Sequence, residues 1–184
     1  MVQKTYSLEV ELPEGVTANV HGNSLIVKGP KGEIKRDIEN PRFAMKADAK
    51  IVSLALKSGL KQSQRDKMHI NSYQSHIKNL INGVIHGYTA KLKVCSGHFP
   101  MTVTIDTNGK FAVKNFLGEK VPRTVNVKHG AKVDVQGDII TVTGLDKEIV
   151  GQTAADLEQL TRITNRDRRI FQDGIYITKK PGEE

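Results

Sequence analysis

Apolar and polar residues alternate in short runs over the first third of the chain. Between residues 6 and 56 the apolar side chains recur at every second position, which is the period of a half-buried β-strand. The runs are separated by turn-forming sequences such as Pro13-Glu14-Gly15, Gly22-Asn23 and Pro30-Lys31-Gly32. The pattern predicts an antiparallel sheet with strands at residues 6–12, 16–21, 25–28, 33–38, 43–47 and 51–56.

The period changes to three and four residues after Ser63. Apolar side chains then mark one face of a long helix, at Ile70, Tyr73, Ile77, Leu80, Ile81, Val84 and Tyr88. Ser63 followed by Asp66 has the spacing of a capping box, and Gly87 is a typical helix stop. One helix over one sheet predicts a first α+β unit.

Strand and helix patterns recur in the second half of the chain. Strands are predicted near residues 92–94, 101–105 and 111–113, a helix from Asp146, and a last strand at residues 174–178. An offset of 115 residues also brings three glycine pairs into coincidence, with apolar residues in phase between them: Gly15 with Gly130, Gly22 with Gly137 and Gly29 with Gly144. We interpret this coincidence as a duplicated hairpin.

The predicted fold class is therefore α+β, with two tandem similar domains from an internal duplication, each a mainly antiparallel sheet covered by one helix. Residues 1–80 are expected to form the first part of the N-terminal domain, which a return strand within residues 81–115 completes. Residues 116–184 are expected to form the C-terminal domain.

The composition favours a folded, basic protein with an acidic partner. Apolar residues make up 38% of the 184 residues, and the formal net charge is +8. Such a charge is typical of proteins that bind nucleic acid or an anionic membrane surface. The single cysteine, Cys95, excludes an internal disulfide, and no apolar run is long enough to span a membrane. We expect a cytoplasmic protein.

Four arginines lie where the helical pattern gives way to the last strand: Arg162, Arg166, Arg168 and Arg169. A guanidinium is a planar fork of donors that matches phosphate geometry, so such a segment is a candidate phosphate clamp. Cations at the end of a helix also interact favourably with the helix dipole. Both interpretations are open at this point.

The search for catalytic or metal chemistry finds little. Cys95 and His98 have the spacing of one ligand pair of a zinc site, but no second pair accompanies them. This favours a core thiol and a surface histidine. The glycine-containing segment of residues 29–32 joins two strands and is expected to be a β-turn, because a phosphate loop would lead into a helix. We expect no enzyme activity and no cofactor.

The segment Asn115-Phe116-Leu117-Gly118-Glu119-Lys120, followed by Pro122-Arg123-Thr124-Val125, resembles the domain junction of a ribosomal family. This is the universal large-subunit ribosomal protein numbered six, in its archaeal and eukaryotic branch, whose eukaryotic members are numbered nine. The C-terminal segment is similar to that family's signature at Gln159, Ile163, Arg166, Arg169, Phe171, Asp173, Gly174, Tyr176 and Lys180.

The resemblance implies a structural constituent of the large subunit that binds large-subunit rRNA chiefly through its C-terminal domain. It also implies a position near the sarcin–ricin region and the base of the factor-binding stalk, beside neighbouring ribosomal proteins. An adaptor between proteins is the alternative, and the two differ in whether the chain binds rRNA in a salt-sensitive way.

The predicted RNA-binding residues combine the arginine segment with nearby cations and polar groups: Arg162, Arg166, Arg168, Arg169, Lys179, Lys180, Lys120, Arg123, Gln172 and Tyr176. For Tyr176, stacking on a base and burial in the sheet are both open. A second basic stretch, Lys57, Lys61, Arg65 and Lys67, has no assigned role and is either a solvated helix start or a further contact.

Overall fold

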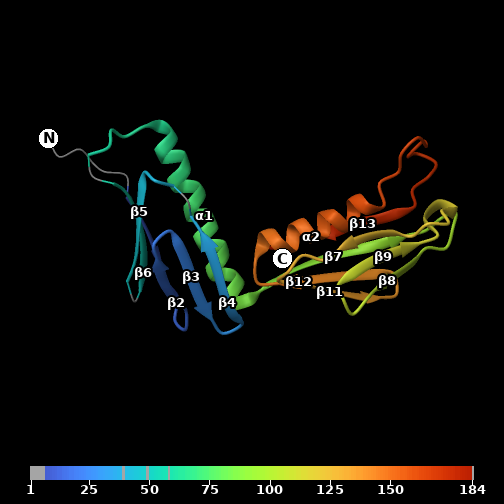
Figure 1. Ribbon diagram of the computed structural model, residues 1–184, viewed down its shortest axis with the longest axis horizontal. Helices are drawn as coiled ribbons and strands as arrows, with labels where there is room; N and C mark the ends of the chain where they lie inside the picture. The colour runs from blue at the N-terminus through green and yellow to red at the C-terminus, as the bar shows by residue number, and fades with distance from the viewer. Residues whose placement is uncertain (1–6, 39, 49, 58, 184) are drawn as a thin grey trace. The chain divides into compact units, whose positions relative to one another are not determined.

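The computed structural model describes residues 7–38, 40–48, 50–57 and 59–183. The chain divides into two compact units, unit 1 at Met1–Gly87 and unit 2 at Tyr88–Glu184. Each unit combines antiparallel sheets with one helix (Figure 1). The predicted fold class is confirmed. None of the helices in the described residues is long and apolar enough to cross a membrane.

Unit 1 has its strands before its helix. The described strands form two three-stranded sheets, with orders β1-β6-β5 and β2-β3-β4. Their bounds are β1 (Ser7–Glu11), β2 (Thr17–His21), β3 (Ser24–Gly29), β4 (Gly32–Asp37), β5 (Phe43–Ala47) and β6 (Ile51–Leu56). The strand positions agree with the alternating pattern, although the pattern predicted one sheet instead of two. Tyr6, the predicted first residue of the first strand, lies outside the described residues.

The helix of unit 1, α1 (Gln64–His86), begins and ends where the capping signals predicted. The Ser63 hydroxyl accepts hydrogen bonds from the Arg65 and Asp66 amides, and the Asp66 carboxylate accepts one from the Ser63 amide. The reciprocal bonds between Ser63 and Asp66 form the capping box. Gly87 ends the helix with a φ of 72°, a value that glycine adopts without strain. The apolar face of α1 is buried in the core of the unit.

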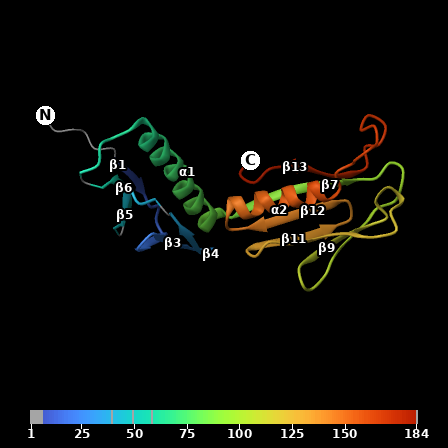
Figure 2. The ribbon, with the colours of Figure 1, turned by 45° about the horizontal axis from the view of Figure 1, so that its top comes forward.

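Unit 2 interleaves its strands and helix differently. Its sheets have the orders β11-β12-β7-β13 and β10-β9-β8. The bounds are β7 (Tyr88–Cys95), β8 (Thr102–Ile105), β9 (Lys110–Lys114), the short 3-10 helix η1 (Phe116–Gly118), β10 (Arg123–Asn126), β11 (Ala131–Gln136), β12 (Ile139–Gly144), α2 (Lys147–Leu160) and β13 (Gly174–Lys179). The turned view in Figure 2 shows α2 lying along the four-stranded sheet.

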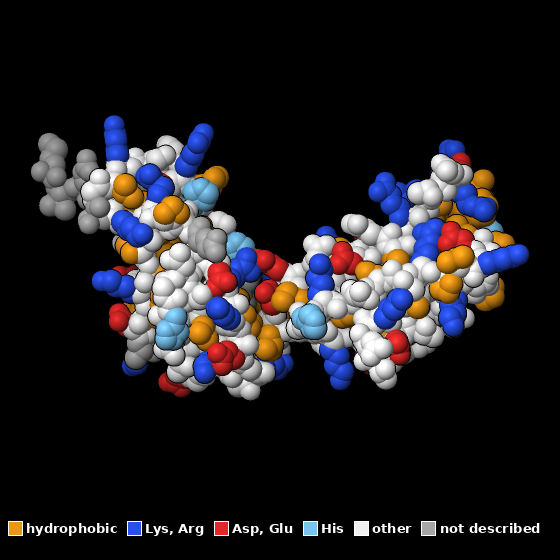
Figure 3. All heavy atoms as spheres, in the orientation of Figure 1, with side chains coloured by type: hydrophobic (Ala, Val, Ile, Leu, Met, Phe, Trp, Pro, Cys, Tyr) orange, Lys and Arg blue, Asp and Glu red, His pale blue; other side chains and the backbone are white. Residues whose placement is uncertain are grey.

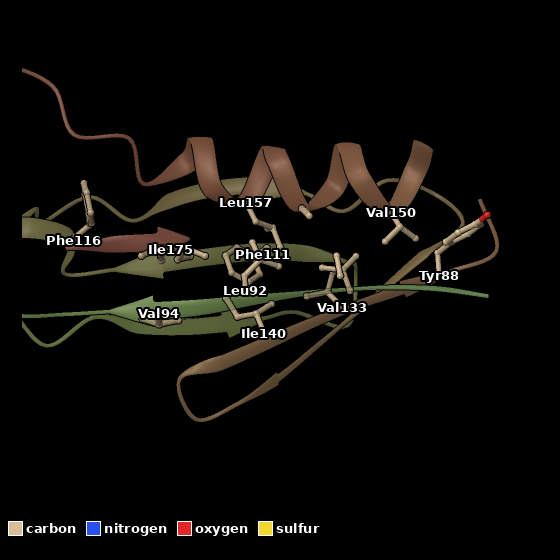
Figure 4. Packing of buried hydrophobic residues seen from close by; sticks show 14 residues of the cluster. Tyr88, Leu92, Val94, Phe111, Phe116, Val133, Ile140, Val150, Leu157 and Ile175 are labelled. Carbon is tan, nitrogen blue, oxygen red and sulfur yellow. The ribbon is translucent and has the colours of Figure 1, made fainter. Parts of the chain in front are cut away.

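The core of unit 2 draws on almost every one of its elements. Leu157 of α2, Leu92 of β7 and Phe111 of β9 are each fully buried (Figure 4). Val150, near the start of α2, packs so closely on Gly144 that a β-carbon at Gly144 would lie 2.7 Å from a Val150 methyl group. The helix therefore approaches the end of β12 through a position that only glycine fits.

The structure corrects the predicted domain boundaries. The prediction assigned residues up to 115 to the N-terminal domain, with a return strand within residues 81–115 completing it. Instead β7 is an inner strand of unit 2, paired with β12 on one side and β13 on the other. The boundary between the units lies at Gly87 and Tyr88. The alternation that predicts a strand does not say which partner the strand pairs with, so the boundary was placed too late in the chain.

The duplication is confirmed in the strand order, but in another register from the predicted one. In each unit the first strand pairs with the sixth, and the sixth pairs with the fifth: β1-β6-β5 in unit 1 and β7-β12-β11 in unit 2. The second, third and fourth strands form a separate meander, which is β2-β3-β4 in unit 1 and β8-β9-β10 in unit 2. The β2–β3 hairpin thus corresponds to β8–β9, and Gly22 to Gly109, which have φ values of 62° and 72°. The offset of 115 had matched β2–β3 with β11–β12. Hairpins with a two-residue turn and a left-handed glycine have the same spacing of apolar residues around the turn. The sequences of β2–β3 and β11–β12 therefore match although the two hairpins do not occupy equivalent places in the two units.

Candidate nucleic-acid interface

The four arginines of the C-terminal segment lie on one loop. We call residues 162–173 the arginine loop; it connects the end of α2 to the start of β13 and projects from one end of unit 2 (Figure 1). All four arginine side chains are exposed. The prediction that two ordered elements flank the arginines is confirmed.

Buried hydrogen bonds close the base of the arginine loop. Thr161 is 3% exposed, and its hydroxyl accepts a hydrogen bond from the Ile175 amide at 2.8 Å and donates one to the Glu158 carbonyl at 3.2 Å. The Glu158 carboxylate accepts a hydrogen bond from the Ile177 amide at 3.0 Å. These contacts tie the first residues of β13 to the last turn of α2, so the two ends of the loop are held together.

Arg123 holds the start of the arginine loop through hydrogen bonds within unit 2. Its Nη1 donates to the carbonyl oxygens of Leu160, at 2.9 Å, and Arg162, at 3.2 Å. Its other edge makes two hydrogen bonds with the Glu119 carboxylate, at 2.8 and 2.6 Å, which lower the pKa of Glu119. The guanidinium also lies 4.3 Å from the centroid of the Phe116 ring. Arg123 therefore caps the C-terminal end of α2 and orients the first residue of the loop.

Asp173 holds the other end of the loop. Its carboxylate is 1% exposed and accepts hydrogen bonds from the Gly97 amide, the His98 amide at 3.1 Å and the His98 ring Nδ1 at 3.0 Å. Burial by itself would raise the pKa of Asp173, but these three hydrogen bonds outweigh it and lower the pKa below its ordinary value.

The lowered pKa of Asp173 predicts a loss of stability in acid. A carboxylate whose pKa is lowered by folding stabilises the folded state above its unfolded pKa of about 4, and this stabilisation is lost as the pH falls through the folded pKa. We expect Asp173→Asn to be less stable at pH 7 and to lose less further stability between pH 5 and pH 3 than the parent protein. Urea unfolding across this range measures the difference. Asp138→Asn, in an exposed hairpin turn, is the control and should keep the parent profile.

An aromatic stack supports Arg166. Its guanidinium lies 4.9 Å from the centroid of the Phe171 ring, and the Phe171 ring lies 4.9 Å from the His98 ring. A guanidinium on the face of a ring keeps its N–H donors in its own plane, where they remain available to an outside acceptor. The stack therefore positions Arg166 without using all of its donors.

The other three arginines differ in how far they are engaged. Arg169 makes a two-pronged ion pair with Asp167, with the closest approach at 2.7 Å, and this ion pair lowers the pKa of Asp167. The side chains of Arg162 and Arg168 make no hydrogen bond or ion pair with any residue that the structure describes. Both line a hollow of about 410 Å³, which Tyr176 and Ile163 also border.

The structure brings most, but not all, of the predicted RNA-binding residues together. Gln172 is exposed on the loop, and the Tyr176 hydroxyl donates to the Gln172 carbonyl at 3.2 Å. Lys120 is exposed between η1 and β10. Lys179 and Lys180 lie at the opposite end of β13, on the side where Gly151 near the start of α2 faces Pro181. These two lysines are therefore separated from the loop by the length of the strand.

Sequence reasoning missed the residues that hold the arginine loop in place. Glu119 and Phe116 fix Arg123, and His98 connects Asp173 to Phe171. The sequence signal was weak, because Arg123 and His98 lie 39 and 75 residues before the loop residues that they contact, Arg162 and Asp173. His98 belongs to this network, and no group of residues that could hold a metal ion occurs in the described part of the chain.

The chain is similar to a known family of proteins along most of its length. A family model described as Ribosomal protein L6 matches it twice, at residues 12–87 and 99–174. The two matches are offset by 87 residues, which agrees with the register of duplication seen in the strand order.

Curated relatives from archaea extend the similarity. A large ribosomal subunit protein uL6 of Methanocella arvoryzae is 44% identical over 173 residues, which cover 94% of this chain and 96% of the relative. The proteins of the same name from Methanobrevibacter smithii and Haloquadratum walsbyi are 44% and 39% identical, again over 94% of each chain. The chain belongs to the ribosomal protein L6 family.

Proposed function

We propose that this protein is a structural constituent of the large ribosomal subunit and binds large-subunit rRNA through the arginine loop. The observation that carries the proposal is a loop with four exposed arginines whose two ends are fixed by buried hydrogen bonds. The relatives are named as large-subunit proteins, which supports the same conclusion. Their family is one of ribosomal proteins, and the proposed role requires no catalysis and no cofactor.

The binding step is the neutralisation of RNA phosphates by a surface that is already ordered. Each arginine that binds a phosphate releases condensed counterions, and this release drives association. Because the base of the loop is closed before RNA arrives, little conformational entropy is given up on binding. Arg162 and Arg168, whose side chains make no hydrogen bond or ion pair with a described residue, are the first candidates for such phosphate binding.

The supporting residues have separate roles in this proposal. Arg166 presents its donors from the Phe171 stack, and Arg169 is oriented by Asp167. Arg123 acts as a brace for the loop, because its donors are engaged within unit 2. Gln172 and Lys120 add polar and charged groups at the rim of the loop. Tyr176 borders the hollow between Arg162 and Arg168, where the ring could stack on an unpaired base.

Lys179 and Lys180 contribute to rRNA binding at a second place on unit 2 in this proposal. Lys180 is exposed, and Lys179 is half-buried beside it. A phosphate bound there would be distinct from those bound by the arginine loop.

The proposed place of unit 2 is near the sarcin–ricin region of the large rRNA and the base of the factor-binding stalk, in the cytoplasmic ribosome. The support is the resemblance of the Asn115–Lys120 junction and of the C-terminal arginine segment to the archaeal and eukaryotic branch of the family. Neighbouring ribosomal proteins are the expected protein partners. Nuclease protection of large-subunit rRNA by the purified protein tests the place, and protection elsewhere would contradict it.

The rRNA-binding proposal predicts a specific salt dependence for an arginine variant. Replacing Arg162, Arg166 and Arg168 together by Ala leaves up to three phosphates without a cation. The slope of log affinity against log salt should then become shallower by roughly 0.7–0.9 for each phosphate that is no longer neutralised. This corresponds to a fall in affinity of roughly 30- to 80-fold for three phosphates at about 0.2 M salt. Filter binding or fluorescence titration with large-subunit rRNA over a salt series measures both quantities.

A charge-matched control separates the loop from general basicity. Lys28, Lys35 and Lys46 are exposed on β3, β4 and β5 of unit 1, and their triple replacement by Ala lowers the net charge by the same amount. We expect this control to keep the parent slope. If the arginine variant keeps the parent salt slope and only has a lower melting temperature, the arginines stabilise the C-terminal end of α2 and the proposal fails. An adaptor between proteins would bind rRNA weakly in every variant.

A further inference from the structure

Unit 1 carries more net charge than unit 2 and has no assigned partner. Residues 1–87 contain thirteen Lys and Arg against eight Asp and Glu, a net charge of +5, whereas residues 88–184 carry +3. Part of this charge is balanced locally, since Lys28 pairs with Glu33 at 3.0 Å and Lys35 with Asp37 at 3.9 Å. The excess must therefore lie elsewhere in the unit.

The excess gathers at the start of α1. Four cations follow β6 or lie in the first turn of the helix, and we call them the α1 basic patch: Lys57, Lys61, Arg65 and Lys67. All four are exposed, and none makes a hydrogen bond or ion pair through its side chain with a described residue. Figure 3 shows lysine and arginine side chains projecting around this end of α1.

The backbone that carries the patch is fixed. The backbone carbonyl oxygen of Arg42 accepts a hydrogen bond from the Lys57 amide at 2.9 Å. The Arg42 side chain donates from Nη2 to the Lys61 carbonyl oxygen at 3.1 Å. The same guanidinium binds both oxygens of Asp66, at 2.8 and 2.9 Å. Arg42 thus holds three parts of the stretch together, as Arg123 holds the arginine loop in unit 2.

Neither an ion pair nor the helix dipole within unit 1 explains the presence of these four cations. Asp66, the one acidic residue in the sequence between Lys57 and Lys67, is 2% exposed and already binds Arg42 and the Ser63 amide. The N-terminal end of a helix carries partial positive charge, which disfavours Arg65 and Lys67 in the first turn. The helix-end explanation that is open for cations at a C-terminal end therefore does not apply here.

Exposed apolar side chains lie among the cations. Leu60 is 39% exposed and Met68 is 60% exposed, and both lie in the same short segment as the patch. A surface that mixes unpaired cations with apolar side chains fits a ribonucleic acid strand, which presents phosphates beside apolar sugar and base faces.

We infer that the α1 basic patch is a second RNA-binding surface, which binds phosphates of large-subunit rRNA independently of the arginine loop. The inference rests on the proposed function, because it takes the same rRNA as the partner. It adds unit 1 as a contributor to affinity and assigns a role to four residues that the family resemblance left open.

The test uses the full-length protein with Lys57, Lys61, Arg65 and Lys67 all replaced by Gln. We expect the slope of log affinity against log salt to become shallower by roughly 0.7 for each phosphate set free, and the affinity at about 0.2 M salt to fall roughly threefold per phosphate. We also expect hydroxyl-radical protection of rRNA to disappear at nucleotides that the arginine-loop variant still protects. The melting temperature should be unchanged or higher, since the variant removes cations from the positive end of the helix.

A matched control replaces Lys28, Lys35, Lys46 and Lys50 by Gln, which lowers the net charge of unit 1 equally. An equal fall in affinity in this control would show an effect of total charge and overturn the inference. So would an unchanged slope in the patch variant, which would leave an acidic protein as the remaining kind of partner. If the patch variant binds normally and the arginine-loop variant does not, only this inference fails. If neither variant changes the salt slope, the proposed function fails as well.

Discussion

Separating the chain between Gly87 and Tyr88 is expected to give two fragments that each unfold cooperatively. Each fragment keeps its own sheets, helix and buried core, and fragments of 87 and 97 residues are within the size range of independent domains. A cut between Asn115 and Phe116 is expected to leave the second fragment unfolded. That cut removes β7, the inner strand that pairs with both β12 and β13, together with β8 and β9.

Circular dichroism during urea unfolding measures the outcome for the four fragments. The fragments of residues 1–87 and 88–184 should show sigmoidal transitions, and the fragment of residues 116–184 should show none. The fragment of residues 1–115 should unfold like residues 1–87, with its last 28 residues unstructured. A cooperative transition in residues 116–184 would contradict the assignment of β7 to β9 to unit 2.

Replacing Phe111 by Ala is expected to destabilise unit 2 by about 3–5 kcal/mol and to leave unit 1 unchanged. Phe111 lies on β9, is fully buried, and belongs to the same core as Leu157 of α2 and Leu92 of β7. Truncation removes its buried area and leaves a cavity that the close-packed surroundings fill only in part. Hydrogen exchange, followed by peptide mass spectrometry, reports the stability of each unit separately.

Ile105 is the matched control for Phe111. It pairs directly with Phe111 across β8 and β9 but is 38% exposed, so Ile105→Ala should cost about 0.5 kcal/mol. Faster exchange in unit 1 with Phe111→Ala would return residues 88–115 to the N-terminal domain, where the sequence pattern had placed them.

The structure gives the two candidate RNA surfaces a common design. In each unit one arginine, Arg42 or Arg123, is engaged with a carboxylate and donates to backbone carbonyls of the segment that carries the exposed cations. The engaged arginine orders the backbone, and the partner-free cations are left to meet phosphates. The number of Lys and Arg residues in a segment therefore does not identify the RNA-binding residues, because some of these cations stabilise the folded structure instead.

Local sequence features determined the elements of this protein. The alternation of apolar residues placed the strands, the capping box at Ser63 and the stop at Gly87 bounded α1, and Asp146 marked the start of α2. These signals depend on the geometry of a few neighbouring residues, so they can be read without a partner. The position of the arginine loop between a helix and a strand follows from the same local change of period.

Only the tertiary structure decided how these elements combine. Strand pairing joins residues far apart in the chain, and an alternating segment such as β7 can satisfy any sheet that offers a matching edge and a buried face. The unit boundary and the register of the duplication depend on that choice. The role of Arg123 depends on it too, since its hydrogen bonds with Leu160 and Arg162 exist only once β10 lies beside the end of α2. The sequence identified which side chains carry charge, and folding determined which of them are left without a partner, because ion pairs form between residues that the fold brings together.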